Sequence, residues 1–301
     1  KGAEITVTYY KGFYTEDDLN GDDAPASERT WTLTTDEDGV SLLVESYKVG
    51  GDELYKLGGR AYLPLGTVTV QETKAPQGYE INPTVYVCHF TPDESGRKWI
   101  SFDMTATIPQ AQVMGGVGIR KVDAEDGTAN PRGAASLDGA TFAIYNASEH
   151  AVTVDDAVYE PQTLEDVQAG TAQAIMTIEA HEGVATTDTD GDGADASLPF
   201  GTYYLREVAC GNGYLLDDTV RTVEVREAGA VTWCEDACAN QVIRGDIAFD
   251  KVYEDTKATM PGVAFLVESA TTHERHVVVT DATGHIDTSA AARPHTHRTN
   301  A

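Results

Sequence analysis

A repeat at an offset of 135 residues is the feature that most constrains the fold of this chain. Residues 63–79 read LPLGTVTVQETKAPQGY and residues 198–214 read LPFGTYYLREVACGNGY, and the two segments align without a gap. A repeat of this length marks a structural unit that occurs more than once in the chain. The chain therefore consists of similar domains in tandem rather than of one large fold.

A second repeated block marks where a unit begins. Residues 115–121 read GGVGIRK and residues 245–251 read GDIAFDK. The repeats predict one domain over residues 1–115, a second over 116–245, and a third over 246–301 that contains only part of its strands. Because the third pattern stops early, we expect the chain to be a piece of a longer protein, with any export signal or wall anchor outside it.

The residue pattern predicts an all-β fold. Val, Thr and Tyr alternate with polar residues over many short segments, and helical periodicity is weak. Turn signatures rich in Asp and Gly recur at 34–39, 186–191 and 279–284. Short strands with frequent turns are typical of β-sandwiches, so we expect tandem Greek-key sandwiches of the prealbumin or immunoglobulin type, with the third domain truncated.

The acidic composition argues against two classes of partner. The 21 Lys and Arg residues are opposed by 49 Asp and Glu residues, which gives a formal net charge of −28. Such a field repels phosphate backbones and anionic bilayers, so we expect neither nucleic acid nor a membrane surface as a partner. No apolar run reaches the roughly 20 residues that a membrane helix needs.

The cysteines give little functional information. Four in 301 residues are too few for a disulfide-built scaffold, and their spacing is not that of a zinc site. An oxidising exterior would allow one disulfide, between Cys210 and either Cys234 or Cys238. Cys88 and His89 are consecutive in a strand and point to opposite faces, so they do not form a catalytic pair. We expect no catalytic site for an external substrate, no metal and no cofactor.

Two charged residues lie on strand faces that are otherwise apolar. Lys121 shares its face with Val117 and Ile119, and Glu207 shares its face with Leu205. Burying either charge alone costs several kcal/mol, so each must be paired or neutralised. The ordinary interpretation is a buried ion pair, or a strand end at which both groups reach water. The alternative is a special chemistry between the two side chains.

The second domain resembles the CnaB-type, or SpaA-like, domains of Gram-positive pilins and surface adhesins. The matching segments are the strand ending in Lys121, DGATFAIY, LPFGTYYLREVACGNGY, and NQVIRGDIAFDK at 240–251. In that family a lysine on the first strand forms an isopeptide bond with an asparagine on the last strand, and a glutamate promotes the reaction. By position, the resemblance implies Lys121 and Asn240 as the bonded pair and Glu207 as the acid.

The implied chemistry is consistent with the inward charges. Burial away from water favours the neutral forms of an amine and of a carboxyl group. A neutral Lys121 amine can attack the Asn240 side-chain carbonyl carbon while Glu207 polarises the oxygen and relays protons, and ammonia leaves. This reaction occurs once per molecule. It is a self-modification, and the chain is not expected to be an enzyme.

The other two domains depart from this pattern. In the first domain the alignment places Tyr9 at the lysine position and Gln110 at the asparagine position, while Glu72 is retained. We therefore expect no isopeptide bond there, with Lys11 as the lysine for a displaced bond if one forms. In the third domain Lys251 takes the lysine position, and its partners are expected beyond residue 301.

Two further motifs have simpler interpretations. Residues 188–193 imitate the start of an EF-hand calcium loop, but the twelfth position, which should hold an acid, is Pro199. A turn is the better interpretation. Residues 244–246 spell the integrin-binding tripeptide Arg-Gly-Asp, but they match the strand entry of a repeated unit, which favours a structural role.

The function that these observations favour is a stalk segment of an extracellular pilin or adhesin on a bacterial cell surface. Its partners would be a sortase and the cell wall, through regions outside this chain. One alternative is an adhesin module whose first domain binds host extracellular matrix or glycan, which an exposed aromatic patch would favour. A second alternative is an accessory β-sandwich of an extracellular enzyme.

Overall fold

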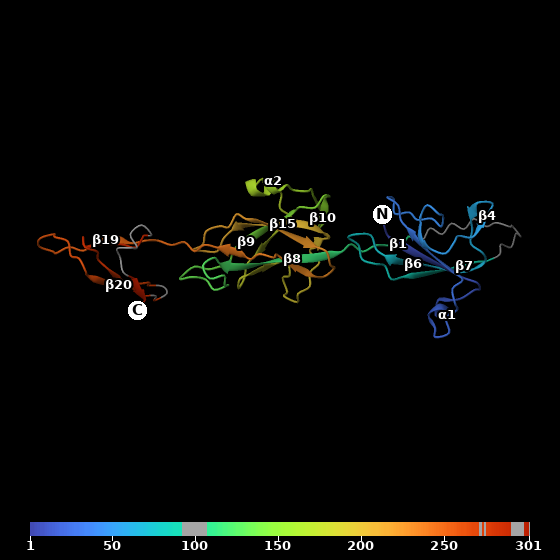
Figure 1. Cartoon of the computed structure of the whole chain (residues 1–301), viewed down its shortest axis with the longest axis horizontal. Helices are drawn as coiled ribbons and strands as arrows, with labels where there is room; N and C mark the ends of the chain where they lie inside the picture. The colour runs from blue at the N-terminus through green and yellow to red at the C-terminus, as the bar shows by residue number, and fades with distance from the viewer. Residues whose placement is uncertain (92–106, 271–272, 274, 290–297, 301) are drawn as a thin grey trace. The chain divides into compact units, whose positions relative to one another are not determined.

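The computed structural model describes residues 1–91, 107–270, 273, 275–289 and 298–300 (Figure 1). Two compact units are present. The first contains residues 1–115 with 198–200 and 226–230, and the second contains the remainder. The main segment of the first unit ends where the first predicted domain ends. The finer partition, with a third domain over 246–301, stays a prediction.

The prediction of an all-β fold is confirmed. The only helices among the described residues are two short ones, α1 (Glu16–Asn20) and α2 (Leu164–Ala169). Neither is long and apolar enough to cross a bilayer.

The first unit is built on a five-stranded antiparallel sheet in the order β3-β2-β1-β6-β7. One face of this sheet buries apolar side chains of β1, β2 and β6, with Trp31 and Val68 almost fully inaccessible. The strands of the sheet are β1 (Glu4–Tyr10), β2 (Arg29–Thr34), β3 (Lys48–Gly51), β6 (Gly66–Lys74) and β7 (Val85–Phe90). A separate pair is formed by β4 (Lys56–Leu57) and β5 (Arg60–Ala61).

The second unit contains a sandwich of two sheets. The first sheet is antiparallel, in the order β12-β9-β15-β16, and the second is organised around β8. The strands are β8 (Met114–Asp123), β9 (Thr141–Asn146), β12 (Met176–Glu179), β13 (Val184–Thr186), β15 (Gly201–Ala209), β16 (Val220–Val225), β17 (Val231–Trp233) and β18 (Cys238–Asn240). A short pairing adds β10 (Val152–Val154) with β11 (Ala157–Tyr159) to this unit. Strand β14 (Leu198–Pro199) pairs with Met114 and Gly115 at the start of β8, and these four residues belong to the first unit.

Both faces of the sheet around β9 and β15 are covered. Phe142 and Leu205 are fully buried on the face toward β8. On the outer face, Val167 of α2 packs with Ala143 and Tyr145 of β9. This double coverage keeps water away from the middle of the sandwich, where the charged residues of β8 and β15 lie.

The first and last strands of the second repeat are neighbours and run parallel. Antiparallel β13 pairs with β8, with Ala185 opposite Ile119. Strand β17 pairs with β8 in parallel, and so does β18, with Cys238 opposite Lys121. Parallel neighbours need a long connection, and here nearly the whole domain lies between them. This arrangement brings residues about 120 positions apart in sequence to the same place.

The described residues beyond 245 contain five further strands. They are β19 (Ala248–Asp250), β20 (Ala264–Glu268), β21 (Arg275–Val279), β22 (His285–Asp287) and β23 (Arg298–Asn300). Strand β19 pairs with β22, and β20 pairs with β21. The rings of Phe249 and Phe265 meet edge to face at 5.0 Å between centroids, and both remain partly exposed.

The strand pairing corrects the predicted alignment of the first repeat. Ile5 of β1 lies opposite Glu72 of β6, just as Phe142 of β9 lies opposite Glu207 of β15. Strand β1 is therefore equivalent to β9, the second strand of its repeat, and not to β8. The prediction that Tyr9 occupies the lysine position is wrong. Strands of period two resemble one another in sequence, and only the pairing register distinguishes them.

Candidate cross-linking site

Lys121 and Glu207 meet in the middle of the second sandwich. Lys121 comes from β8 and Glu207 from β15, each on the apolar face of its strand. The Lys121 Nζ lies 2.9 Å from Glu207 Oε1, and both side chains are completely inaccessible to water. The alternative in which both groups reach water at a strand end is therefore excluded. The two charges satisfy each other where no solvent can.

Asn240 completes the cluster from β18. Its Nδ2 donates hydrogen bonds to both carboxylate oxygens of Glu207, at 3.0 and 2.8 Å, and the residue is 1% exposed. The backbone N–H of Asp217 donates a further bond to Glu207 Oε2 at 2.8 Å. The carboxylate therefore accepts from an amine, an amide and the backbone. The structure thus brings together the lysine, the acid and the amide that the sequence singled out.

Cys238 lies in the same cluster, and the sequence analysis did not assign it there. Its Sγ is 3.4 Å from Lys121 Nζ and 3.3 Å from Asn240 Oδ1. It is fully buried, and burial raises the pKa of its thiol to about 12. A signal was present in the sequence, since residues two apart in a strand share a face and Cys238 precedes Asn240 by two.

The disulfide that an oxidising exterior would allow is not formed in the structure. All four cysteines are free thiols in the structure. Cys238 Sγ is engaged with Lys121 and Asn240, whereas Cys210 Sγ lies after β15 and donates to the backbone oxygen of Tyr214 at 3.1 Å. Cys234 is buried apart from these contacts, and burial raises the pKa of its thiol to about 11.

An ion pair flanks the cluster on the side of β16. Asp217 Oδ2 lies 2.7 Å from Arg221 Nη2, and the two side chains are 17% and 12% exposed. Partial burial acts to raise the pKa of Asp217, but hydrogen bonds from Thr219 and Arg221 outweigh it and lower that pKa to about 2. Asp217 is thus held as a carboxylate, and its oxygen also lies 3.5 Å from Cys238 Sγ.

This arrangement has the parts for amide exchange. An amine and a carboxamide contact one carboxylate, which can carry a proton from one to the other. Once the amine has passed a proton to this carboxylate, it is in the nucleophilic form. A plain buried ion pair needs only Lys121 and Glu207. An ion pair alone does not require the Asn240 amide, which contacts the same carboxylate.

The first unit contains an equivalent acid and amide. Glu72 is 1% exposed and accepts a bond from Gln110 Nε2 at 2.8 Å and another from the backbone N–H of Asn82 at 2.7 Å. These partners correspond to Asn240 and to Asp217 of the second unit. Among the described residues, no cation contacts Glu72.

The lysine alternatives in the first unit do not reach this acid. Tyr9 is buried and donates through its hydroxyl to the backbone oxygen of Leu65 at 2.9 Å. Lys11 is exposed and follows the end of β1 at Tyr10, whereas Ile5 is the residue opposite Glu72. Six residues of extended chain separate Ile5 from Lys11, which is about 20 Å. The displaced bond through Lys11 is excluded.

Lys251 occupies the position that the sequence assigned to it. Phe249 lies opposite Ile286 in the pairing of β19 with β22, as Ile119 lies opposite Ala185 in the second repeat. Lys251 is two residues after Phe249, as Lys121 is two residues after Ile119. It is half-buried. Its role as a bond-forming residue stays a prediction.

The EF-hand-like segment, residues 188–193, makes contacts within itself. The carboxylates of Asp188, Asp190 and Asp192 lie within 4.8 Å of one another. Asp188 accepts the backbone N–H groups of Gly191 and Gly193, as expected of a turn.

The Arg-Gly-Asp tripeptide is also engaged. Arg244 pairs with Glu125 through its guanidinium, and Asp246 accepts a bond from Thr288 Oγ1 at 3.0 Å. These contacts support the structural interpretation of residues 244–246.

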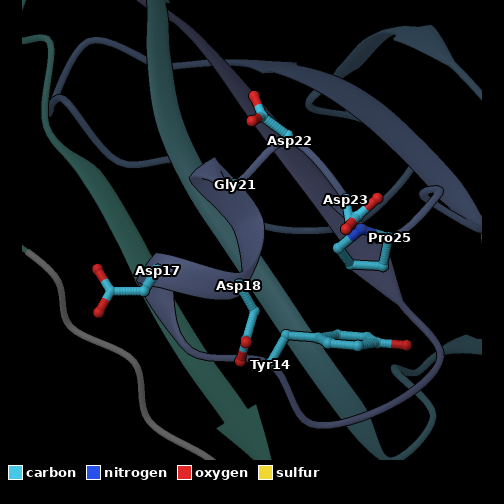
Figure 2. A pocket seen from close by; sticks show the side chains of 7 residues that line it. All are labelled: Tyr14, Asp17, Asp18, Gly21, Asp22, Asp23 and Pro25. Atoms are coloured by element: carbon cyan, nitrogen blue, oxygen red, sulfur yellow. The ribbon is translucent and has the colours of Figure 1, made fainter.

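A surface pocket lies beside α1 in the first unit, lined by Tyr14, Asp17, Asp18, Gly21, Asp22, Asp23 and Pro25. Figure 2 shows the carboxylates of Asp17, Asp22 and Asp23 pointing in different directions. Asp18 is engaged with the backbone N–H and hydroxyl of Thr15 at the start of the helix. The acids do not converge on one point, as the ligands of a bound group would.

The second repeat matches a known family. Residues 115–236 match the family model described as SpaA, a prealbumin-like fold domain. The matched segment includes Lys121 and Glu207 and ends four residues before Asn240. The predicted resemblance and the predicted prealbumin-type sandwich are confirmed. No curated protein matches the chain in sequence.

Several solved structures are similar to this chain, and the first of those named here shares its fold. The TIE protein of Bacillus anthracis has a TM-score of 0.56 at 20% identity, covering 95% of this chain and 39% of that one. A streptococcal ancillary pilin gives 0.31 at 18% identity, with 96% and 80% covered. BcpA, the major pilin subunit of Bacillus cereus, gives 0.29 at 15%, with 95% and 79% covered. The chain thus spans about two fifths of the length of the TIE protein.

Proposed function

Because residues 115–236 form a SpaA domain of prealbumin-like fold, we propose that this chain is a structural stalk segment of a bacterial cell-surface pilin or adhesin. In this proposal the second domain is closed by an isopeptide bond between Lys121 and Asn240, and Glu207 promotes its formation. The segment is extracellular and turns over no substrate. A sortase and the cell wall are its partners through regions outside this chain.

One observation carries the proposal. Lys121, Glu207 and Asn240 are all buried, and Glu207 lies within 3.0 Å of both the amine and the amide. Fully buried charged residues are rare and costly, and a buried carboxylate shared by an amine and an amide is more specific than a buried pair. Lys121 lies on the first strand, β8, Glu207 on β15, and Asn240 on the last strand, β18. Because β8 and β18 are parallel neighbours, this placement supports the same role.

The proposed bond would stabilise the domain chiefly through the unfolded chain. Lys121 and Asn240 enclose a loop of about 120 residues. By analogy with disulfides, closing such a loop restricts the unfolded state by roughly 4–5 kcal/mol. A stalk in an exterior rich in proteases benefits from this, because cleavage requires local or global unfolding.

Intact-mass measurement of the purified chain tests the proposal. Formation of the bond releases one ammonia, so the wild-type chain should be lighter than its sequence by about 17 Da. Tryptic peptides containing Lys121 and Asn240 should remain linked. Glu207→Gln should restore the full mass. A wild-type mass equal to the sequence mass, with Lys121 open to acetylation after denaturation, would leave only a buried ion pair.

The alternatives require features of another kind. A glycan-binding or matrix-binding module needs a site whose polar groups converge on a ligand. The pocket beside α1 has acids that point apart, and it does not favour this role over the stalk.

A further inference from the structure

We infer that the Cys238 thiol takes part in the bond-forming reaction, by donating a hydrogen bond to the Asn240 side-chain oxygen as negative charge develops there. The inference rests on the proposed function, since a donor at this oxygen matters only if Lys121 attacks the Asn240 amide. It assigns to Cys238 a role that Glu207 would otherwise have to fill.

The geometry separates the two roles. When an amine adds to the carbonyl carbon of Asn240, the negative charge develops on Oδ1, and donors already aimed at that atom lower the barrier. Glu207 is not aimed there, because both its oxygens contact Asn240 Nδ2, at 3.0 and 2.8 Å. The group at Oδ1 is the Cys238 thiol, at 3.3 Å. Glu207 is therefore placed to move protons, and Cys238 to stabilise the oxyanion.

The thiol carries the proton that this role needs. Its site is fully buried, and the raised pKa of about 12 keeps the sulfur protonated at neutral pH. For the same reason it is a poor competing nucleophile. The side chains that face it are Lys121, Asn240, Glu207, Asp217 and Arg221.

Asp217 competes for the thiol proton in the resting state. Its Oδ2 is 3.5 Å from Cys238 Sγ, but it already accepts a bond from Arg221 Nη2 at 2.7 Å. Charge on Oδ1 appears only during the reaction, so the thiol bond to Oδ1 strengthens at that moment. A contact that is stronger in the transition state than in the ground state is the kind that accelerates a reaction.

The reaction balances with the thiol unchanged. Lys121 transfers one proton to Glu207, and the neutral amine forms a bond to the Asn240 carbonyl carbon. One proton of the resulting ammonium passes through Glu207 to Asn240 Nδ2. The bond from carbon to Nδ2 then breaks, ammonia leaves, and the carbonyl re-forms. Glu207 ends as the carboxylic acid, and its extra proton passes to solvent when the domain opens transiently. Cys238 keeps its proton throughout.

The test follows the rate of bond formation in newly synthesised chain. The 301-residue chain is made in a cell-free system, synthesis is stopped, and the loss of ammonia is followed by intact mass over time. The variants are Cys238→Ala, which removes the donor, and Cys238→Ser, which keeps one. The matched control is Cys234→Ala, because Cys234 is also a buried thiol of the same domain, and its charged neighbours are Arg221 and Asp236 rather than Lys121 or Glu207.

We expect Cys238→Ala to slow the reaction about tenfold, since loss of a strong oxyanion donor costs about 100-fold to 1,000-fold and a thiol is a weaker donor. Cys238→Ser should form the bond at a rate within about threefold of the wild-type rate, and Cys234→Ala should form it at the wild-type rate. Thermal unfolding of both Cys238 variants in the Glu207→Gln background reports any packing defect without the bond.

Three results decide the matter. Wild-type speed in Cys238→Ala overturns the inference. Equal slowing in the Ala and Ser variants also overturns it, because it indicates packing rather than donation. If Cys238→Ala does not fold, bond formation that is more than tenfold slower in Cys238→Ser than in wild type overturns the inference. Failure of the proposed function is distinguishable from all of these, since the wild-type chain itself would then retain its full mass.

Discussion

The first and second units hold a glutamate at the same register of equivalent strands, yet they surround it differently. Glu207 contacts Lys121 and Asn240, whereas Glu72 contacts Gln110 and, among the described residues, no cation. The acid and the amide therefore belong to the shared framework of the repeat. The second unit also holds a lysine on its first strand, β8, whereas the given sequence of the first unit starts at the strand equivalent to β9.

This comparison shows that a buried glutamate of this repeat can be satisfied by neutral donors. Two neutral donors, the Gln110 amide and the backbone of Asn82, satisfy Glu72. Hydrogen bonds to the charged form can stabilise a buried carboxylate without an opposite charge. The diagnostic feature is the combination of acid, amide and amine.

The largest expected effect comes from removing the lysine. Lys121→Ala prevents the proposed bond, and loss of this loop closure costs about 4–5 kcal/mol. Calorimetry should show the transition of the second unit falling by at least about 10 °C. The first unit should be unaffected. A fall of the first unit, with the second unchanged, would contradict the assignment of the tie to the second.

A second prediction compares the units within the wild-type chain. The first unit has the acid and amide but no proposed bond, so residues 1–115 should be cleaved faster than 116–245 in limited proteolysis. Mass spectrometry of the fragments over time gives both rates in one sample. The Lys121→Ala variant is the control, because it should bring the two rates together. Preferential survival of residues 1–115 in the wild type would count against the comparison.

A smaller effect concerns Asp217, whose equivalent in the first unit is Asn82. The pKa of Asp217 is lowered to about 2, so this carboxylate stabilises the folded state above its ordinary pKa near 4, and the contribution is lost as the pH falls toward 2. Asp217→Asn should cost about 2 kcal/mol at neutral pH.

The measurement is urea unfolding of wild type and Asp217→Asn at several pH values. The difference between them should shrink between about pH 4 and pH 2. The first unit, which has an amide at this position, serves as an internal reference. A difference that stays constant over this range would mean that the ion pair with Arg221 does not carry the effect.

The smallest effect is expected for Glu72→Gln. The new side chain keeps an oxygen for the Asn82 N–H, and Gln110 can turn its Oε1, which is buried without a hydrogen-bond partner, toward the new amide. The melting temperature of the first unit should change by no more than the equivalent of about 1 kcal/mol. Glu207→Gln, in contrast, should lower the second transition strongly. A loss of several kcal/mol in Glu72→Gln would indicate a cation partner for Glu72.

Much of the second domain was predictable from local pattern. Alternation in β8 and β15 placed Lys121 and Glu207 inward, and the structure buries both. The repeats indicated tandem β-sandwiches. Such inferences succeed because side-chain direction in a strand depends only on whether the position is odd or even.

Long-range pairing was the part that the sequence could not supply. The sequence aligns Tyr9 with Lys121 because β1 and β8 share a period-two pattern and each begins a recognisable segment. In the structure, however, β1 lies opposite Glu72 in the same register in which β9 lies opposite Glu207. The sequence alone suggests Cys238 only as a disulfide partner. Its place beside Asn240 follows from strand alternation, but its contact with Lys121 depends on the parallel pairing of β18 with β8.

The parallel pairing of β8 with β18 also has a consequence for how the chain would lengthen under load. Stretching pulls the start of β8 and the end of β18 apart, and an unfolded domain can release its full contour. With Lys121 and Asn240 joined, the force passes through the bond and not through the chain between them. At about 3.3–3.6 Å per residue, the bond prevents roughly 400 Å of chain from being extended. A domain closed in this way would transmit a pull from one end to the other with little change in its length.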